Sequence, residues 1–391
     1  MQNRQTPHAA LPRPLHDENA RQDFVMNFRR YLSRSIAPGA FGAYHKRVEP
    51  ALEASLGRKP ETADEIRPGM LRDPIYQLWS AMQRQSQEMV WDSVIDTIER
   101  SLPEMQEQAS KGGPLGSLRL AGDDFEIPRY HSVYDIHLQP GGYHGEVGRD
   151  DVSAGLIYDM GVPIYSVGMM GKENASTGQT IVNYVRSAHP DFRPLRILDL
   201  GCAIGNSTLP WAQAFPEAEV HGIDVGAGCL RHAHVRANAL GVEAHFSQQN
   251  AEAMDFADGS FDLIVSALLF HETSRSAVPN ILKECARLLA PGGMMVHFDG
   301  FRTEAIDPLR AFFGEWEIYN NNERFLRTVH RLDWVGEVAA AGFERDRVGY
   351  EKTPFVSFEA ITKPGTKGYM TGFGDVPLLV ASKSPALAGG Q

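Results

Sequence analysis

The sequence predicts an α/β protein in which a doubly wound, mostly parallel sheet of seven strands follows an N-terminal, mainly helical domain. From residue 195 onward, short apolar runs alternate with helical segments, the pattern of a parallel sheet covered on both faces. Before residue 125, apolar residues recur instead at the three- and four-residue spacing of helices. With 391 residues, 42% of them hydrophobic, the chain has the length of two domains and the composition of a globular protein.

Residues 1–125 are predicted to form the helical domain, which would either cap a site or form a dimer. The first 20 residues are polar and are expected to be a loose tail. A long amphipathic helix is expected over residues 74–100, and its apolar stripe indicates packing against neighbouring helices or a dimer partner. The stripe consists of Ile75, Leu78, Trp79, Met82, Met89, Val90, Val94, Ile95 and Ile98.

Residues 126–190 are expected to be a lid or linker segment. A break rich in glycine and proline precedes it at residues 111–117. Residues 127–171 are rich in Tyr, His, Gly and Met but lack helical periodicity, so irregular structure or short strands are expected there. Residues 174–185 are predicted to form a helix that leads into the second half of the chain.

Residues 191–362 carry the predicted sheet, and residues 363–391, rich in Gly, Ala and Ser, are predicted to be a weakly ordered tail. The strands are expected over residues 196–200, 219–224, 245–248, 261–266, 294–298, 345–348 and 355–362. The helices between them are expected near residues 209–215, 230–240, 278–289 and 333–341.

The most informative segment is Asp199-Leu-Gly-Cys-Ala-Ile-Gly205, which follows the end of the first predicted strand. Gly201 and Gly205 allow the backbone to approach a ligand closely, and ligands of open parallel sheets lie beyond the carboxyl ends of the strands. A dinucleotide site would need Gly-x-Gly-x-x-Gly, but Ala203 and Asn206 stand at its second and third glycine positions. The pyrophosphate alternative is therefore disfavoured.

S-adenosylmethionine, which carries no phosphate, is the second candidate ligand. Its ammonium group can be attracted by an acidic residue such as Asp199, and its ribose needs an acceptor at the end of the next strand, where Asp224 stands. A lone aspartate at a strand end is usually a turn or cap residue. Two of them flanking a glycine turn favour ligand contact. Cys202, inside the loop, is interpreted as a small filler rather than a reactive thiol.

The order of these motifs over residues 195–362 resembles the class I S-adenosylmethionine-dependent methyltransferases of the small-molecule, type 11-like kind, which have a Rossmann-like fold. The loop resembles the family's first motif with Ala203 in place of its middle glycine. Asp224 matches the ribose-binding acid, and Asn250-Ala-Glu252 matches the stretch beside the adenine. The resemblance implies S-adenosyl-L-methionine as methyl donor, bound by Asp199, Gly201, Cys202, Ala203, Gly205, Asp224, Asn250, Ala251, Glu252, Ser266 and Ala267.

Methyl transfer from a sulfonium is an in-line displacement, so positioning and desolvation supply most of the catalysis. A base is needed only if the acceptor must lose a proton. His271 follows the fourth predicted strand of the domain, where the resemblance places the reactive methyl, and it is the candidate base. The alternative is that His271 and Glu272 only orient the loop. Tyr143 and His144, in the lid segment, are further candidate catalytic residues.

Three histidines of the lid segment, His131, His137 and His144, lie close to Asp135 and Glu146 in the sequence. A divalent metal site is one hypothesis for this cluster. Its spacings match no standard metal signature, so a lid over the acceptor pocket or structural packing are the alternatives, and no metal is predicted. Further candidate lining residues are Tyr158, Tyr319 and Asn321.

The charge and composition of the chain disfavour several classes of binding partner. The formal net charge of −11 disfavours nucleic acid and anionic membrane surfaces, which attract basic patches. No apolar run approaches the roughly 20 residues that cross a bilayer, no secretory signal is seen, and three cysteines fit a reduced cytoplasm. We expect an enzyme that methylates an oxygen or nitrogen of a small metabolite and can dimerise through its N-terminal helices. Another S-adenosylmethionine-dependent reaction, or a non-enzymatic regulatory protein, are the alternatives.

Overall fold

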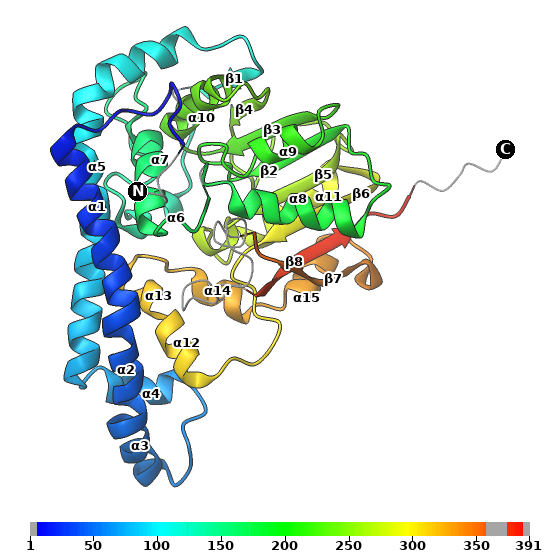
Figure 1. Ribbon diagram of the computed structural model, residues 1–391. Helices are drawn as coiled ribbons and strands as arrows, with labels where there is room; N and C mark the ends of the chain where they lie inside the picture. The colour runs from blue at the N-terminus through cyan, green and yellow to red at the C-terminus, as the bar shows by residue number, and fades with distance from the viewer. Residues whose placement is uncertain (1–5, 123, 172, 357–373, 386–391) are drawn as a thin grey trace.

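A mixed sheet of eight strands occupies the C-terminal half of the chain in the computed structural model, which describes residues 6–122, 124–171, 173–356 and 374–385. The strands lie in the order β1-β4-β3-β2-β5-β6-β8-β7, as Figure 1 shows. β1 to β6 are parallel, whereas β8 is antiparallel to β6 and to β7. The bounds are β1 Ser117–Arg119, β2 Arg196–Leu200, β3 Glu219–Asp224, β4 His245–Gln248, β5 Phe261–Ala267, β6 Leu289–Phe298, β7 Val348–Pro354 and β8 Asp375–Ser382.

The direction in which the chain adds strands changes between β2 and β5. From β2 it proceeds through β3 to β4 on one side, and it then returns to place β5 and β6 on the other side. This is the doubly wound, mostly parallel arrangement that the sequence predicts. The carboxyl ends of β2 and β5 therefore flank the switch point at which such sheets bind ligands.

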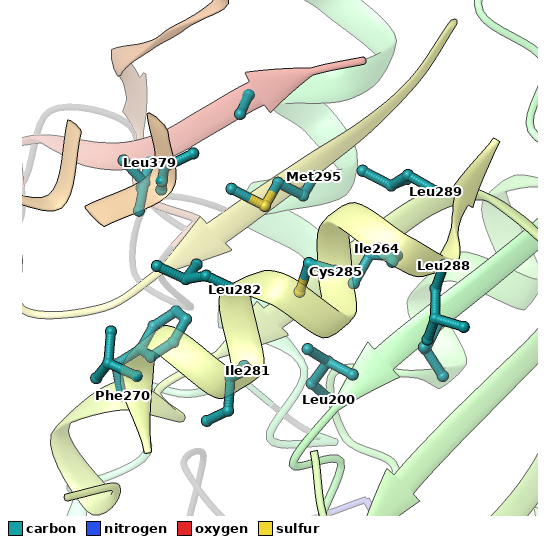
Figure 2. Packing of buried hydrophobic residues seen from close by; sticks show 14 of the residues in the cluster. Leu200, Ile264, Phe270, Ile281, Leu282, Cys285, Leu288, Leu289, Met295 and Leu379 are labelled. Atoms are coloured by element: carbon teal, nitrogen blue, oxygen red, sulfur yellow. The ribbon is translucent and has the colours of Figure 1, made fainter. Parts of the chain in front are cut away.

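Helices cover both faces of the sheet because their apolar residues recur at helical spacing. Figure 2 shows Ile281, Leu282 and Cys285 of α11 (Val278–Leu288) packed among strand residues that include Leu200, Ile264, Met295 and Leu379. Each buried leucine or isoleucine of this kind contributes about 1.5–3 kcal/mol. The other helices of this half are α8 Ser176–Ala188, α9 Leu209–Ala214, α10 Ala227–Ala239, η4 Phe270–Glu272, α15 Trp334–Ala340 and η5 Arg345–Arg347.

Two edges of the sheet differ from the prediction. Residues 117–119, at the end of the expected linker, form β1 beside β4, so the sheet has one more strand than expected. The strand expected at residues 345–348 is mostly the helical turn η5, and β7 begins only at Val348. β1 has only three residues, too few for a two-residue pattern, so its sequence carries little signal.

The predicted tail over residues 363–391 is wrong for Asp375–Ser382, which forms β8 in the middle of the antiparallel part of the sheet. Its apolar residues pack against β6, and Leu378 and Leu379 are fully buried. The strand expected over residues 355–362 is absent at residues 355–356, and residues 357–362 lie outside the described residues.

The N-terminal region is helical as predicted, with α5 as its longest element (Figure 1). α5 begins where Asp73 accepts hydrogen bonds from the backbone N–H groups of Ile75 and Tyr76, and it continues beyond residue 100 to Lys111. α1 begins at His16, so the expected tail of 20 residues is too long. The elements are α1 His16–Tyr31, η1 Leu32–Ile36, α2 Ala37–Ala43, η2 Tyr44–Val48, α3 Glu49–Leu56, α4 Ala63–Met70 and α5 Pro74–Lys111.

The expectation of irregular structure over residues 127–171 is wrong for Ser153–Tyr165, which forms the helix α7. α7 is buried on almost every side between α5 and α10, so it is apolar all round and shows no amphipathic period. The buried Asp159 of α7 pairs with His232 (2.8 Å) and Arg236 (3.3 Å) of α10, which ties the helical layer to the sheet half. The short turns before α7 are α6 Arg129–Ser132 and η3 Ile136–Leu138.

A second helical segment follows β6 and joins the N-terminal helices. It comprises α12 Pro308–Gly314, α13 Trp316–Asn320 and α14 Leu326–Arg331. Phe312 and Trp316 pack against Tyr76 and Trp79 of α5 in one aromatic cluster. This contact places residues 315–323 beside the lid segment, at the carboxyl edge of the sheet.

None of the helices among the described residues has both the length and the apolarity required to cross a bilayer.

Candidate active site

A cavity of about 470 Å³ lies at the switch point, at the carboxyl ends of β2, β3, β4 and β5. We call its two sides the sheet wall and the charged wall. Six residues of the sheet wall are predicted site residues: Gly201, Ala203, Asp224, Asn250, Ala251 and Ala267. The charged wall comprises Arg29, His137, His271, Glu272, Glu317 and Glu323.

The glycine loop after β2 forms the centre of the sheet wall. Gly201 has a φ of +67°, and a Cβ atom there would lie 2.8 Å from Leu269 Cδ1. Gly205 has a φ of +76° and packs as closely on the ring of Phe246. Ala203 adopts a φ of +45° although it is not glycine. Ala203, which stands in place of the middle glycine, thus occupies a backbone region that disfavours a Cβ atom.

Asp224 joins the glycine loop to the end of β3. Its Oδ2 accepts from the Ala203 backbone N–H (2.9 Å), and its Oδ1 accepts from the Gly226 N–H (2.8 Å). Burial raises the pKa of Asp224. Each carboxylate oxygen has a second lone pair, so Asp224 can still accept from a hydroxyl in the cavity.

Asp199 is fully buried behind the loop and does not line the cavity. Its Oδ2 accepts from Ser207 Oγ (2.7 Å) and Thr208 Oγ1 (2.6 Å), while its Oδ1 is buried without a hydrogen-bond partner among the described residues. Burial raises the pKa of Asp199 to about 6. The carboxylate therefore holds the loop, and one of its oxygens lacks the donor that a buried oxygen normally finds.

Four other predicted cofactor residues also lie outside the cavity wall. Cys202 is buried in the core behind the loop, where burial raises its thiol pKa far above the usual range, in agreement with a filler role. Ser266 pairs with His297 Nδ1 (2.8 Å) on the inner side of the sheet. The remaining two are Gly205 and Glu252.

Asn250 and its neighbours form the part of the sheet wall after β4. Asn250 Oδ1 accepts from the Glu252 backbone N–H (2.9 Å), which leaves its amide nitrogen and the second lone pair of Oδ1 for a ligand. Glu252 accepts from the hydroxyl of Tyr130 (3.0 Å), which lines the cavity from the lid segment.

His271 lies in the charged wall just after β5, and Asp299 orients it. His271 Nδ1 is 2.8 Å from Asp299 Oδ1, and Asp299 Oδ2 accepts from the backbone N–H groups of Phe270 (2.8 Å) and His271 (3.2 Å). Burial alone would lower the pKa of His271, but the Asp299 carboxylate outweighs burial and raises it to about 9.

His137 faces His271 across the cavity, with its Nε2 3.6 Å from Glu272 Oε1 and its Nδ1 3.1 Å from Glu323 Oε1. Burial opposes a positive charge here as well, yet the two glutamates raise the pKa of His137 to about 10. The structure separates His137 from the two histidines with which the sequence grouped it. His131 and His144 pack against each other instead, with ring centroids 5.6 Å apart.

Tyrosines complete the wall beside His137. Tyr143 and Tyr158 line the cavity edge to face, with centroids 5.5 Å apart, and burial raises both phenol pKa values above the usual range. His144 lies outside the cavity wall. Neither Tyr319 nor Asn321 lines the cavity: Tyr319 is 54% exposed, whereas Asn321 is buried and contacts His137 from behind.

Several wall residues escaped sequence analysis. Gln249 of the wall adjoins the predicted Asn250, and Asp299, which lies behind the wall, directly follows a predicted strand, so the positions of both carried a signal. Arg29, Glu317 and Glu323 come from helical segments with no local motif. Such residues reach the site only through packing between distant parts of the chain.

Comparison with known proteins finds a family match for part of the sheet half. Residues 197–293 match the family model described as a methyltransferase domain. Over 174 residues, the chain is 30% identical to the malonyl-[acyl-carrier protein] O-methyltransferase of Methylococcus capsulatus, which covers 44% of this chain and 59% of that protein. Over 103 residues, it is 38% identical to the demethylmenaquinone methyltransferase of Thermus thermophilus, which covers 26% and 46%.

The chain thus spans about half the length of the curated relatives that it matches. Among solved structures, an O-methyltransferase family protein from Burkholderia thailandensis aligns with a TM-score of 0.41 at 17% identity, over 57% of this chain and 60% of that one. The matched family segment contains the glycine loop and Asp224 but none of the N-terminal helices, the lid segment or residues 315–323.

Proposed function

We propose that this chain, which carries a class I S-adenosylmethionine-dependent methyltransferase domain over residues 197–293, transfers a methyl group from S-adenosylmethionine to an oxygen or nitrogen of a small molecule. The observation that carries the proposal is that the sheet wall and the charged wall line the same cavity. Its volume of about 470 Å³ suits small molecules. The net charge of −11 supports such an acceptor over nucleic acid.

The sheet wall fits the methyl donor. Asp224 would accept from the ribose hydroxyls, and Asn250 would hydrogen-bond the adenine. The unpartnered Oδ1 of Asp199 suits a positively charged donor such as an ammonium group, which would enter from the loop side. When bound, the cofactor supplies a sulfonium methyl that is already activated. The chain's own contribution is to position the two reactants and exclude water.

The charged wall supports a polar acceptor. His271 and Tyr143, two of the three predicted catalytic residues, both face the cavity, and we assign them to acceptor binding and catalysis. His144 lies behind the wall, and we propose no direct part in catalysis for it. The Tyr143 phenol stays neutral because burial raises its pKa, so it would act by hydrogen bonding.

The N-terminal helices support a cap role. Arg29 of α1, and Gln83 and Trp91 of α5, line the cavity and would exclude water from the sulfonium. We also propose that these helices form a homodimer, because Phe24 and Tyr31 of α1 are 59% and 53% exposed. Sedimentation velocity of the full chain measures this, and a monomer across micromolar concentrations contradicts it.

The cofactor proposal is tested by isothermal titration of the purified chain with S-adenosylmethionine and with its demethylated product. We expect micromolar or tighter binding of both, and absence of binding to either would overturn the proposal. The reaction is tested by incubating the protein with a metabolite extract and the donor carrying a deuterated methyl group. Mass spectrometry should find a product that has gained this methyl group, whereas a product made from the donor by another route favours the alternative reaction type.

A further inference from the structure

Three side chains of the charged wall converge as a set of metal ligands. One ligand atom from each of His137, His271 and Glu272 lies within 4.8 Å of the other two. The Nε2 atoms of His137 and His271 are 3.6 Å and 3.8 Å from Glu272 Oε1. Ligands of a tetrahedral zinc ion, with bonds of about 2.0–2.2 Å, lie roughly 3.3 Å apart, so the two nitrogen–Glu272 distances need only small shifts, and the two imidazoles must also draw together from a separation of at most 4.8 Å.

Both imidazoles are oriented by a carboxylate on the opposite nitrogen. Asp299 lies 2.8 Å from His271 Nδ1, and Glu323 lies 3.1 Å from His137 Nδ1, which Asn321 Nδ2 also approaches to 2.9 Å. Asp299 is fully buried, and the Glu323 side chain is 8% exposed. Metal-bound histidines almost always donate their other ring N–H to such a partner, which fixes the ring and makes the ligating nitrogen more basic.

The backbone at His137 is held in a strained conformation. His137 has a φ of +52°, in the left-handed backbone region that disfavours a residue with a Cβ atom. Its carbonyl accepts from Trp91 Nε1 (2.8 Å) and Gln87 Nε2 (2.9 Å) of α5. Strain maintained by neighbouring side chains in this way is typical of functional positions.

The charge of the wall also calls for a cation. Four carboxylates lie in or directly behind it: Glu272, Asp299, Glu317 and Glu323. Arg29 is the lining arginine, and its hydrogen bonds go to the uncharged groups Ser86 Oγ, Gln87 Oε1 and the Tyr165 carbonyl. Buried carboxylates are costly unless a positive charge compensates them; protonated His137 and His271 supply part of that charge in the metal-free chain, and a divalent ion would replace their protons.

We propose that His137, His271 and Glu272 bind one divalent transition-metal ion of the zinc and iron(II) class, which ligates a hydroxyl oxygen of the acceptor. This inference rests on the proposed methyl transfer and narrows its acceptor from oxygen or nitrogen to a hydroxyl compound. Two imidazoles and one carboxylate suit this class of ion and leave coordination positions open. His271 then acts as a ligand through Nε2 rather than as the base.

The chemistry balances without a further reactant. The acceptor hydroxyl binds the ion and releases its proton to water, because coordination lowers the pKa of a bound hydroxyl. Its oxygen then forms a bond to the methyl carbon while the carbon–sulfur bond of the sulfonium breaks. The products are the methyl ether and the neutral thioether, S-adenosylhomocysteine.

Elemental analysis and cobalt titration of the full chain test the site without an activity assay. We expect one zinc or iron ion per chain as purified. After treatment with a chelator, added Co²⁺ should give visible absorption bands that saturate at one equivalent. Glu272→Gln keeps the side-chain shape, and His137→Ala removes a ligand; each should weaken Co²⁺ binding about 100-fold or more.

His45→Ala is the matched control, since it removes a 61% exposed histidine far from the cavity and should bind Co²⁺ as the unmodified chain does. Circular dichroism and thermal melting confirm that each variant is folded. A folded chain that binds S-adenosylhomocysteine but neither contains nor takes up a metal ion overturns the metal site and leaves the proposed function standing. Equal Co²⁺ binding by Glu272→Gln, His137→Ala and the control also overturns it. A chain that binds Co²⁺ but no S-adenosylhomocysteine overturns the proposed function instead.

Discussion

The two walls of the cavity are constructed in different ways. The sheet wall comes from consecutive strand ends between Gly201 and Leu269, and many of its contacts are made by the backbone. The charged wall gathers side chains from segments as far apart as Arg29 and Glu323. This difference in construction corresponds to two tasks, cofactor binding and acceptor binding. A local supersecondary unit presents a common cofactor site, whereas packing between distant helices shapes the site for a particular acceptor.

The walls also differ in their electrostatics. In the sheet wall, Asp224 is satisfied by backbone N–H groups, whereas in the charged wall imidazoles and carboxylates hold one another. If each wall performs its own task, single substitutions should damage cofactor binding or acceptor chemistry separately. The following predictions test that separation, beginning with the largest expected effect.

Asp224→Ala should lower the affinity for S-adenosylhomocysteine about 100-fold or more. The loop loses the acceptor for the Ala203 and Gly226 N–H groups, and each hydrogen bond to a charged group contributes about 1.5–3 kcal/mol. Isothermal titration measures the loss. Asp262→Ala is the control, because Asp262 also accepts from two backbone N–H groups but stands at the opposite end of the sheet. It should reduce stability without changing affinity, and an equal loss of affinity would contradict a local cofactor wall.

Asp299→Asn should lower kcat about 10- to 100-fold while the affinity for S-adenosylhomocysteine changes less than about threefold. Asp299 orients His271 and accepts from the backbone N–H groups of Phe270 and Gly300, and it has no hydrogen bond to a residue of the sheet wall among those described. Steady-state kinetics and titration together give the two values. The control is Asp307→Asn, which alters the exposed cap of α12 and should change neither. A parallel fall in cofactor affinity would show that the walls are coupled.

Asp199→Asn should change the pH dependence of stability by about 1–3 kcal/mol. The folded pKa of about 6 lies above the usual value of 3.8, so the folded state binds more protons than the unfolded state between these values. The free energy of unfolding therefore falls as the pH rises from about 4 to 6, and the variant lacks this decline. Urea unfolding at pH 4.5 and pH 7 measures it. If the free energy of unfolding changes equally between pH 4.5 and pH 7 in both proteins, the Asp199 carboxyl group does not cause the decline.

Ala203→Gly should have the smallest effect, a rise of at most about 1 kcal/mol in the free energy of unfolding. Glycine relieves the strain of the positive φ but gains conformational freedom in the unfolded chain, and these effects largely cancel. Urea unfolding checks the value, and cofactor affinity should stay within about threefold. A clear loss of stability would indicate that the Ala203 methyl group contributes packing within the sheet wall.

The sheet was predictable because its signals are local. Buried strands such as β2 and β5 are short apolar runs, and the glycine loop and Asp224 stand at strand ends that the chain order alone identifies. Elements whose apolar residues show no local periodicity were not predicted. α7 is apolar on all sides, and β8 lies in a segment whose composition is typical of a tail.

By itself, the sequence determined the α/β class, the switch-point loop and the position of Asp224, because strand periodicity and turn geometry depend on neighbouring residues. Only the tertiary structure decided which motif residues face the cavity. Side chains of one loop point to opposite sides, so Ala203 lines the site while Cys202 fills the core. It also decided that His137 meets His271 rather than His131 and His144. That pairing depends on the packing of α5 against the lid segment, which no local pattern of residues encodes.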